Sequence, residues 1–135
     1  MPGNFLDTNV LIYLASADVE KANRAEQLVD KGGVVSIQVL NEIANVGRRK
    51  LRMSWSEIHE FLATLRALLT LQPLTLDVHD SGLAIAERYG LALYDAMIVA
   101  AALHCDCDAL WSEDMQHGLV IEDRLRIVNP FAAQR

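Results

Sequence analysis

Short apolar runs alternate with longer stretches of helical periodicity along this chain. A short extended segment at residues 4–6 and the apolar runs at 34–37, 74–76 and 109–112 are typical of strands, and a fifth strand is expected at 119–121 or 126–128. Between these runs, periodicity and capping signals predict helices, in chain order at residues 10–15, 20–31, 38–49, 55–70, 77–90 and 94–104.

Polar residues at the expected helix starts support these boundaries. Thr8 or Asn9 is expected to cap the first helix, because either side chain can accept a hydrogen bond from a free backbone N–H. Ser54, followed three residues later by Glu57, predicts a capping box, and Asp77 is expected to cap the helix after the third strand.

Strands that alternate with helices indicate an α/β fold with a mainly parallel sheet of about five strands flanked by helices. The length fits a single domain over residues 1–135, and the helix at 94–104 is apolar nearly all round, so we expect it to be buried. Ligands of such sheets bind beyond the carboxyl ends of the strands, where the strand order reverses. Acidic residues just after strands are therefore the candidates for a functional site.

The composition places few limits on function but excludes some classes. Hydrophobic residues make up 52% and charged residues 22%, a balance typical of a compact globular protein. No apolar run approaches the roughly 20 residues of a membrane helix, and we expect no signal segment and no membrane association. Cys105 and Cys107 are too close for an unstrained disulfide and too few for a zinc site, which suggests a reducing cytoplasm.

The net charge of −6 argues against a protein that coats nucleic acid by bulk electrostatics. Basic residues are nevertheless concentrated in one place. Four of the twelve Lys and Arg residues stand together, namely Arg48, Arg49, Lys50 and Arg52. A solvated surface is the alternative to a phosphate contact for this basic stretch.

Four carboxylates stand where a ligand site is expected. Asp7 follows the first strand, Glu42 lies on a polar helix stripe, Asp95 opens the most apolar helix, and Asp114 follows the fourth strand, where Glu113 competes with it. Each has an ordinary alternative role, as a helix cap, a solvated side chain or a loop acid. Together they lie on the strand-end side of one sheet, and such a set suits Mg²⁺ or Mn²⁺ and phosphodiester chemistry.

The chain resembles PIN-domain proteins, and more narrowly the VapC-type toxins of toxin–antitoxin pairs. The resemblance covers almost the whole chain and rests on four segments that occur in the right order. These are Phe5-Leu6-Asp7-Thr8-Asn9, Ser36-Ile37-Gln38-Val39-Leu40-Asn41-Glu42, Tyr94-Asp95-Ala96-Met97-Ile98-Val99-Ala100-Ala101 and Leu110-Trp111-Ser112-Glu113-Asp114-Met115-Gln116-His117-Gly118.

The resemblance implies a PIN-like three-layer sandwich and a metal-dependent endoribonuclease. The conserved acids of the family fall on Asp7, Glu42, Asp95 and Asp114, which would hold one or two Mg²⁺ or Mn²⁺ ions, with Asp7 and Asp95 as the first choice of ligands. Supporting roles would fall to Thr8, Asn9 and Ser112; the family often has threonine at the last of these positions.

The resemblance also implies partners. The substrate would be RNA, with Arg48, Arg49, Lys50 and Arg52 beside its phosphates. A cognate antitoxin would insert a cationic side chain, most simply an arginine, into the acid cluster and lay an amphipathic segment near Trp55, Ile58 and Leu62. A homodimer is also expected.

Other functions remain open at this stage. Aspartyl-phosphate phosphatases need a second aspartate where Asn9 stands, and phosphoacceptor domains need a lysine after the last strand, whereas the last lysine here is Lys50. A housekeeping RNA-processing nuclease and a catalytically inactive PIN-fold binding module remain as alternatives.

Overall fold

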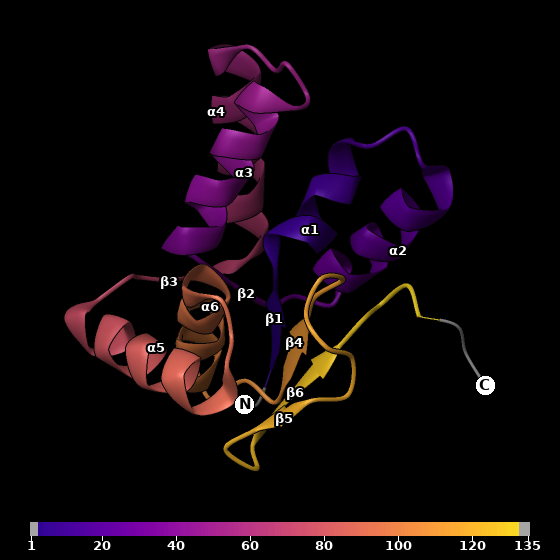
Figure 1. Cartoon of the computed structure of the whole chain (residues 1–135). Helices are drawn as coiled ribbons and strands as arrows, with labels where there is room; N and C mark the ends of the chain where they lie inside the picture. Colours follow the sequence, from indigo (N-terminus) through magenta and orange to yellow (C-terminus); the bar gives the residue numbers. More distant parts are fainter. Residues whose placement is uncertain (1–2, 133–135) are drawn as a thin grey trace.

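The computed structural model describes residues 3–132, which form a six-stranded sheet covered by helices (Figure 1). The strands are β1 (Asn4–Leu6), β2 (Val34–Ser36), β3 (Thr70–Gln72), β4 (Ala109–Trp111), β5 (Val120–Ile121) and β6 (Leu125–Val128). The helices are α1 (Thr8–Leu11), the 3₁₀ turn η1 (Ile12–Ala15), α2 (Val19–Asp30), α3 (Ile37–Arg49), α4 (Trp55–Leu68), α5 (Leu76–Tyr89) and α6 (Leu93–His104).

The sheet has the order β3-β2-β1-β4-β6-β5, and every neighbouring pair is parallel except the β5–β6 hairpin. From β1 the order runs one way to β2 and the other way to β4, so the topological switch point lies between β1 and β4. The register pairs Leu6 with Trp111, so Asp7 and Ser112 follow two adjacent strand ends. This is the place where ligands of parallel sheets bind.

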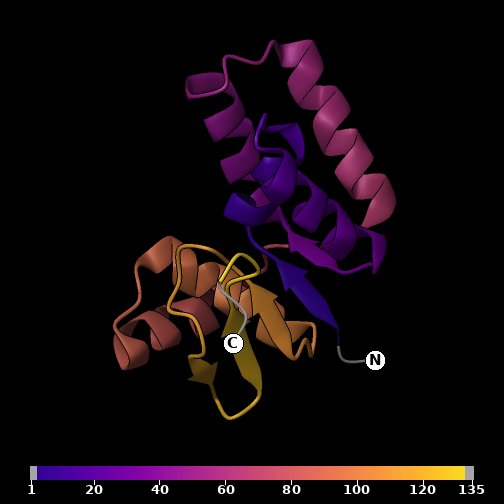
Figure 2. The ribbon, with the colours of Figure 1, turned by 90° about the vertical axis from the view of Figure 1, so that its right-hand side faces the viewer.

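The helices lie in layers on the two sides of the sheet. In Figure 1, α5 and α6 lie on one side of the sheet, and α1 and α2 lie on the other. Helices α3 and α4 form a pair that projects beyond the carboxyl ends of the strands, as Figure 2 also shows. The α/β sandwich with a mainly parallel sheet is therefore confirmed, although it has six strands where about five were expected.

Two of the predicted helix caps are wrong. Asp7 itself caps α1, because its Oδ1 accepts a hydrogen bond from the Thr8 N–H at 2.7 Å, where Thr8 or Asn9 was expected to serve. Thr75 caps α5 in place of Asp77, which lies in the first turn of the helix. The capping box that begins α4 is confirmed.

The third strand was predicted at residues 74–76 and lies instead at Thr70–Gln72, next to β2. Helix α4 ends at Leu68, which frees this segment for pairing. Pro73 directly follows the strand and has no N–H to donate to a neighbour, so the ladder stops there. At the other edge both candidate strands form, because 120–121 and 125–128 pair with each other.

The core lies where the sequence pattern indicated. All eight residues from Ala96 to Leu103 of α6 are buried, since α5 covers the face of α6 that would otherwise meet solvent. Gly82 of α5 permits this contact, because a Cβ at this position would lie 2.5 Å from the Met97 sulfur. Cys105 and Cys107 are free thiols, as expected. Within residues 3–132, no helix is long and apolar enough to cross a membrane.

Candidate active site

All four predicted acids line one cavity at the carboxyl ends of the strands. The cavity has a volume of about 360 Å³. Its lining residues are Asp7, Thr8, Asn9, Ile12, Glu42, Val46, Lys50, Leu51, Asp95 and Asp114. The acids come from four separate segments: the end of β1, helix α3, the first turn of α6 and the loop after β4. The fold thus brings together carboxylates that are up to about a hundred residues apart in sequence.

Asp7 is almost completely buried, with 3% of its surface exposed. Three donors hold its carboxylate: the Thr8 N–H at 2.7 Å, the Ser112 hydroxyl at 2.8 Å and the Asn9 amide at 3.2 Å. The helix-capping role and a role in the cavity are therefore not alternatives, because Asp7 caps α1 with one oxygen and meets Ser112 with the other.

Glu42 is half-buried on the face of α3 that borders the cavity. Its Oε1 accepts a hydrogen bond from the Thr8 hydroxyl at 2.7 Å, and its Oε2 accepts one from the Gln38 amide at 3.1 Å. Gln38 lies one helical turn before Glu42, so the polar stripe of α3 orients its own carboxylate. Of the three residues expected to support the site, Asn9 and Ser112 contact Asp7, and Thr8 contacts both Asp7 and Glu42.

Asp95 and Asp114 are held less tightly. Asp95 is half-buried at the start of α6, and Asp114 is exposed on the loop after β4. Within residues 3–132, neither carboxylate accepts a hydrogen bond from another side chain. These two acids therefore keep the free oxygen atoms of the cavity, whereas Asp7 and Glu42 are already fixed by donors from the chain.

The cavity disfavours the negative charge that it contains. Burial raises the pKa of Asp7 from its ordinary 3.8 to about 7, and the charges of Glu42 and Asp95 add to this, against the lowering effect of the hydrogen bonds from Ser112 and Thr8. Burial, together with the charges of Glu42 and Asp114, also raises the pKa of Asp95. A cation in the cavity would relieve this repulsion.

The donor set fits a divalent cation that prefers oxygen ligands, since the acids present carboxylate oxygens only. Within residues 3–132, no three Asp, Glu, His or Cys side chains are arranged so that they alone could hold an ion. Mg²⁺ is usually bound by one or two carboxylates and completes its octahedron with water and phosphate oxygens. The arrangement therefore suits such an open site better than a closed cage of protein ligands.

The predicted basic stretch divides into residues with different surroundings. Lys50 lines the acid cavity and also a smaller hollow beside it, which it shares with Arg49. Arg48 is turned elsewhere: its guanidinium donates to the Met53 carbonyl at 2.9 Å and lies 4.4 Å from the centre of the Trp55 ring. Of the four basic residues, Lys50 lines the acid cavity, and Arg49 lines only the smaller hollow.

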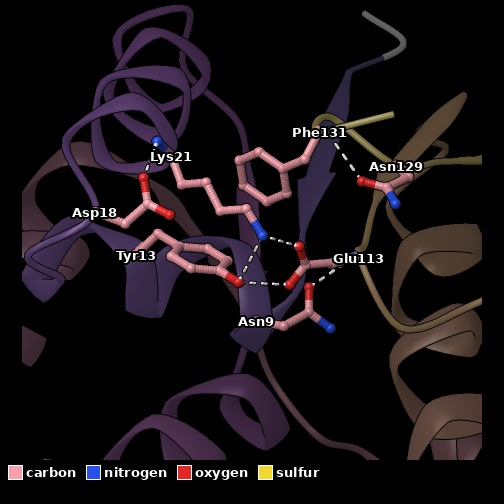
Figure 3. Close-up of polar contacts among 7 residues, drawn as sticks. All are labelled: Asn9, Tyr13, Asp18, Lys21, Glu113, Asn129 and Phe131. Atoms are coloured by element: carbon pink, nitrogen blue, oxygen red, sulfur yellow. Dashed lines mark hydrogen bonds and ion pairs between the residues drawn. The ribbon is translucent and has the colours of Figure 1, made fainter. Parts of the chain in front are cut away.

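A second polar cluster, formed by Tyr13, Lys21 and Glu113, was not predicted from the sequence (Figure 3). It adjoins Asn9, which lines the cavity. The Glu113 carboxylate accepts hydrogen bonds from the Tyr13 hydroxyl at 2.7 Å and from the Lys21 ammonium at 2.6 Å. Glu113 is thus occupied by these partners and does not line the cavity, in contrast to Asp114. No spacing in the sequence indicates this cluster, because Lys21 and Glu113 are 92 residues apart.

Comparisons with known proteins agree with the observed fold. The PIN-domain family model matches residues 5–119. A search of curated proteins finds no significant match. Among solved structures, a toxin–antitoxin complex from Klebsiella pneumoniae is similar with a TM-score of 0.73 at 20% identity, covering 96% of this chain and 99% of that one.

Two further structures show the same fold. A sarcin–ricin-loop-cleaving VapC toxin from Mycobacterium tuberculosis has a TM-score of 0.68 at 19% identity, covering 82% of this chain and 89% of that one. A DNA-bound VapBC complex from Salmonella typhimurium has a TM-score of 0.66 at 19% identity, covering 94% of this chain and 97% of that one. At these identities the likeness demonstrates a shared fold.

Proposed function

The chain belongs to the PIN-domain family, whose members are nucleases, and from this premise we propose that it is a metal-dependent endoribonuclease of the VapC toxin type. One observation carries the proposal. Four carboxylates from four segments line a single cavity of about 360 Å³, and Lys50 borders the same cavity. This combines a cation site with a phosphate contact, as hydrolysis of a phosphodiester requires.

The chain's own residues then have distinct roles. Asp7 and Asp95 hold a Mg²⁺ or Mn²⁺ ion, and Glu42 and Asp114 complete its surroundings directly or through water. When bound, such an ion supplies the positive charge that offsets the charge of the phosphodiester and favours attack by water. Ser112 keeps the Asp7 carboxylate in place by its hydrogen bond at 2.8 Å.

The position of Lys50 supports an RNA contact within the basic stretch. Its ammonium borders the acid cavity and can meet a backbone phosphate that enters it. Arg49 lies one hollow further along, and Arg52 is exposed, so both are suited to weaker contacts with the same strand. Arg48 is committed to Met53 and Trp55, and it contributes mainly to the shape of this end of α3.

The proposed partner is a cognate antitoxin, as in the toxin–antitoxin complexes with this fold. A groove of about 500 Å³ between α3 and α4 supports a docking segment, with Ile37, Leu40 and Leu62 among its lining residues. Of the three residues expected at such a surface, Leu62 lines the groove and Trp55 is exposed, but Ile58 is buried against α3 and cannot take part. An arginine of the partner would enter the acid cavity.

A cleavage assay tests the nuclease. The purified protein is incubated with a single-stranded or looped RNA in Mg²⁺ or Mn²⁺, with excess chelator, and in parallel as the Asp7→Asn protein prepared in the same way. We expect cleavage only by the unaltered protein with metal. Cleavage that persists in chelator would overturn the metal dependence, and equal cleavage by Asp7→Asn would overturn the site.

The toxin role is tested by co-expression with the product of a small reading frame, where one is encoded next to this gene. We expect co-purification, inhibition of cleavage, and release of the inhibition when the partner's cationic residue is removed. An active enzyme that neither binds nor is inhibited by the neighbouring product would favour a housekeeping RNA-processing nuclease. We also propose that the chain forms a homodimer, which size-exclusion chromatography of the isolated chain tests. We expect the enzyme to act in the cytoplasm.

A further inference from the structure

Asp114 is the least supported carboxylate of the cavity. It is exposed, and within residues 3–132 no side chain donates a hydrogen bond to it. Its position must therefore follow from the backbone of its loop. That backbone is tied on the near side by the Ser112 N–H, which donates to the Val128 carbonyl at 2.9 Å, and on the far side by the Met115 N–H, which donates to the Ser112 hydroxyl at 3.3 Å.

Two further ties join this loop to the segment around Asp7: the Ser112 hydroxyl donates to the Asp7 carboxylate at 2.8 Å, and Glu113, the residue directly before Asp114, contacts three residues of that segment. Its N–H donates to the Asn9 side-chain carbonyl at 2.8 Å. Its carboxylate accepts from the Tyr13 hydroxyl at 2.7 Å with one oxygen and from the Lys21 ammonium at 2.6 Å with the other. Both the backbone N–H and the carboxylate of Glu113 are thus bonded to the segment that follows Asp7.

Lys21, Tyr13 and Glu113 form a closed ring of contacts, which we call the polar clamp. The Lys21 ammonium also donates to the Tyr13 hydroxyl at 3.1 Å, so each member contacts the other two. The ammonium lies 4.7 Å from the centre of the Tyr13 ring and 5.0 Å from that of Phe131 (Figure 3). A ring of three polar groups restrained by two aromatic rings permits less displacement than a single ion pair does.

The polar clamp connects the two sides of the topological switch point. Tyr13 lies on η1, which continues the helix that Asp7 caps, and Lys21 lies in the first turn of α2. Glu113 lies in the loop after β4. Asn9 completes the connection, because its amide contacts the Asp7 carboxylate at 3.2 Å while its carbonyl accepts from the Glu113 N–H.

We propose that Lys21, Tyr13 and Glu113 are positioning residues that hold Asp114 at the distance from Asp7 at which both can serve one divalent ion. The inference rests on the proposed function, since it assigns these residues to the same metal site. The residues of the polar clamp do not touch the ion themselves. They act on the loop, and through the loop on the carboxylate that lacks a partner of its own.

The test measures Mn²⁺ affinity by titrating the metal-free protein with Mn²⁺. Water-proton relaxation reports the binding, at a temperature well below that of unfolding. The variants are Lys21→Met and Glu113→Gln, which remove the ion pair with little change of shape. We expect about 10-fold weaker Mn²⁺ binding for each, in the range typical of residues that orient metal ligands. Lys21→Arg keeps the charge, and we expect it to restore most of the affinity.

Arg124→Met is the matched control. It removes an ion pair of similar length, 2.8 Å to Asp106, that lies outside the cavity. We expect its Mn²⁺ affinity to equal that of the unaltered protein. In cleavage assays the variants of the polar clamp should need about 10-fold more Mn²⁺ for half-maximal rate, with the rate largely recovered at saturation.

A purely structural polar clamp would lower the unfolding temperature of Lys21→Met and leave its Mn²⁺ affinity unchanged, and that result would overturn the inference alone. If the unaltered protein neither binds Mn²⁺ nor cleaves RNA, the proposed function fails and the inference fails with it. The two failures are therefore distinguished by the unaltered protein.

Discussion

Glu113 and Asp114 are adjacent in the chain and carry the same chemical group, but their surroundings are opposite. Glu113 has a cation and a hydroxyl on its two carboxylate oxygens. Burial opposes its charge, yet the hydrogen bonds from Lys21 and Tyr13 outweigh this and lower its pKa. Asp114 faces a cavity that it shares with three other acids, and within the described residues no side chain pairs with it.

The same contrast separates the polar clamp from the acid cavity as a whole. In the polar clamp every charge is compensated by another group of the chain. In the cavity, burial and the charges of neighbouring carboxylates raise the pKa of Asp7 and of Asp95, and the chain supplies neutral donors and one bordering cation, Lys50. Uncompensated acids lower the stability of a fold, and the divalent ion that we propose for this cavity would supply the missing charge.

The largest effect should come from Asp7, the most buried acid of the cavity. Asp7→Asn keeps the shape of the side chain and removes its charge, so it deprives the proposed ion of a ligand. We expect at least about a 100-fold loss of RNA cleavage at saturating Mn²⁺, with a folded protein by circular dichroism. Glu113→Gln, by contrast, should recover at saturation, and equal losses in the two variants would erase the distinction between the cavity and the polar clamp.

The second effect is on stability and depends on pH. The pKa of Asp7 is raised to about 7 in the folded protein from an ordinary value of 3.8. A carboxyl group with a raised folded pKa contributes stability below its unfolded pKa and loses this contribution as the pH rises through the folded value. In metal-free buffer, Asp7→Asn should therefore gain stability over the unaltered protein between about pH 4 and pH 7.

This gain should reach a few kcal/mol, with an upper bound of about 4 kcal/mol. Urea unfolding of both proteins across the pH range measures it, and Asp106→Asn on the exposed surface is the control. A difference that does not grow with pH would show that Asp7 is not held at a raised pKa. Saturating Mn²⁺ should reduce the difference, because the ion binds the folded unaltered protein and stabilises it.

Removing a donor from the cavity should have a smaller effect. Ser112→Ala takes away the buried hydroxyl that donates to Asp7, and we expect a loss of about 1–3 kcal/mol in the free energy of unfolding. The loss should be larger above pH 7, where Asp7 is ionised. Ser112→Thr keeps the hydroxyl and serves as the control, since it should retain most of the stability; if both variants lose the same amount, the hydrogen bond is not the cause.

The smallest effect should come from the basic stretch, and within it from Lys50. In the inactive Asp7→Asn background, Lys50→Met should weaken RNA binding severalfold and reduce the slope of log K against log salt by about 0.7, the value for one phosphate contact on a single strand. Arg48→Met is the matched control, because Arg48 is bonded to Met53 and stacked on Trp55. Equal effects of the two variants would contradict the separation of Lys50 from the rest of the basic stretch.

The sequence by itself determined the kind of fold, and it was sufficient to single out the four acids that line the cavity. Apolar runs and caps are local signals, so the alternation of strands and helices could be predicted from them. The burial of α6 could also be predicted, because its residues are apolar on all sides of the helix. Segment boundaries were less certain where two local signals competed. The helix was expected to reach residue 70 and the strand to begin at 74, whereas pairing with β2 makes residues 70–72 the strand.

Tertiary structure decided which acids the chain itself binds and which face the cavity without a partner. Local rules assign Asp7 to a cap or to a site, and only the fold shows that its two oxygens serve both roles. The sequence also left Glu113 and Asp114 as competitors, because their separation depends on Lys21, which is 92 residues away from Glu113. Contacts between distant segments form only when the sheet brings strand ends together, and no local pattern in the chain encodes them.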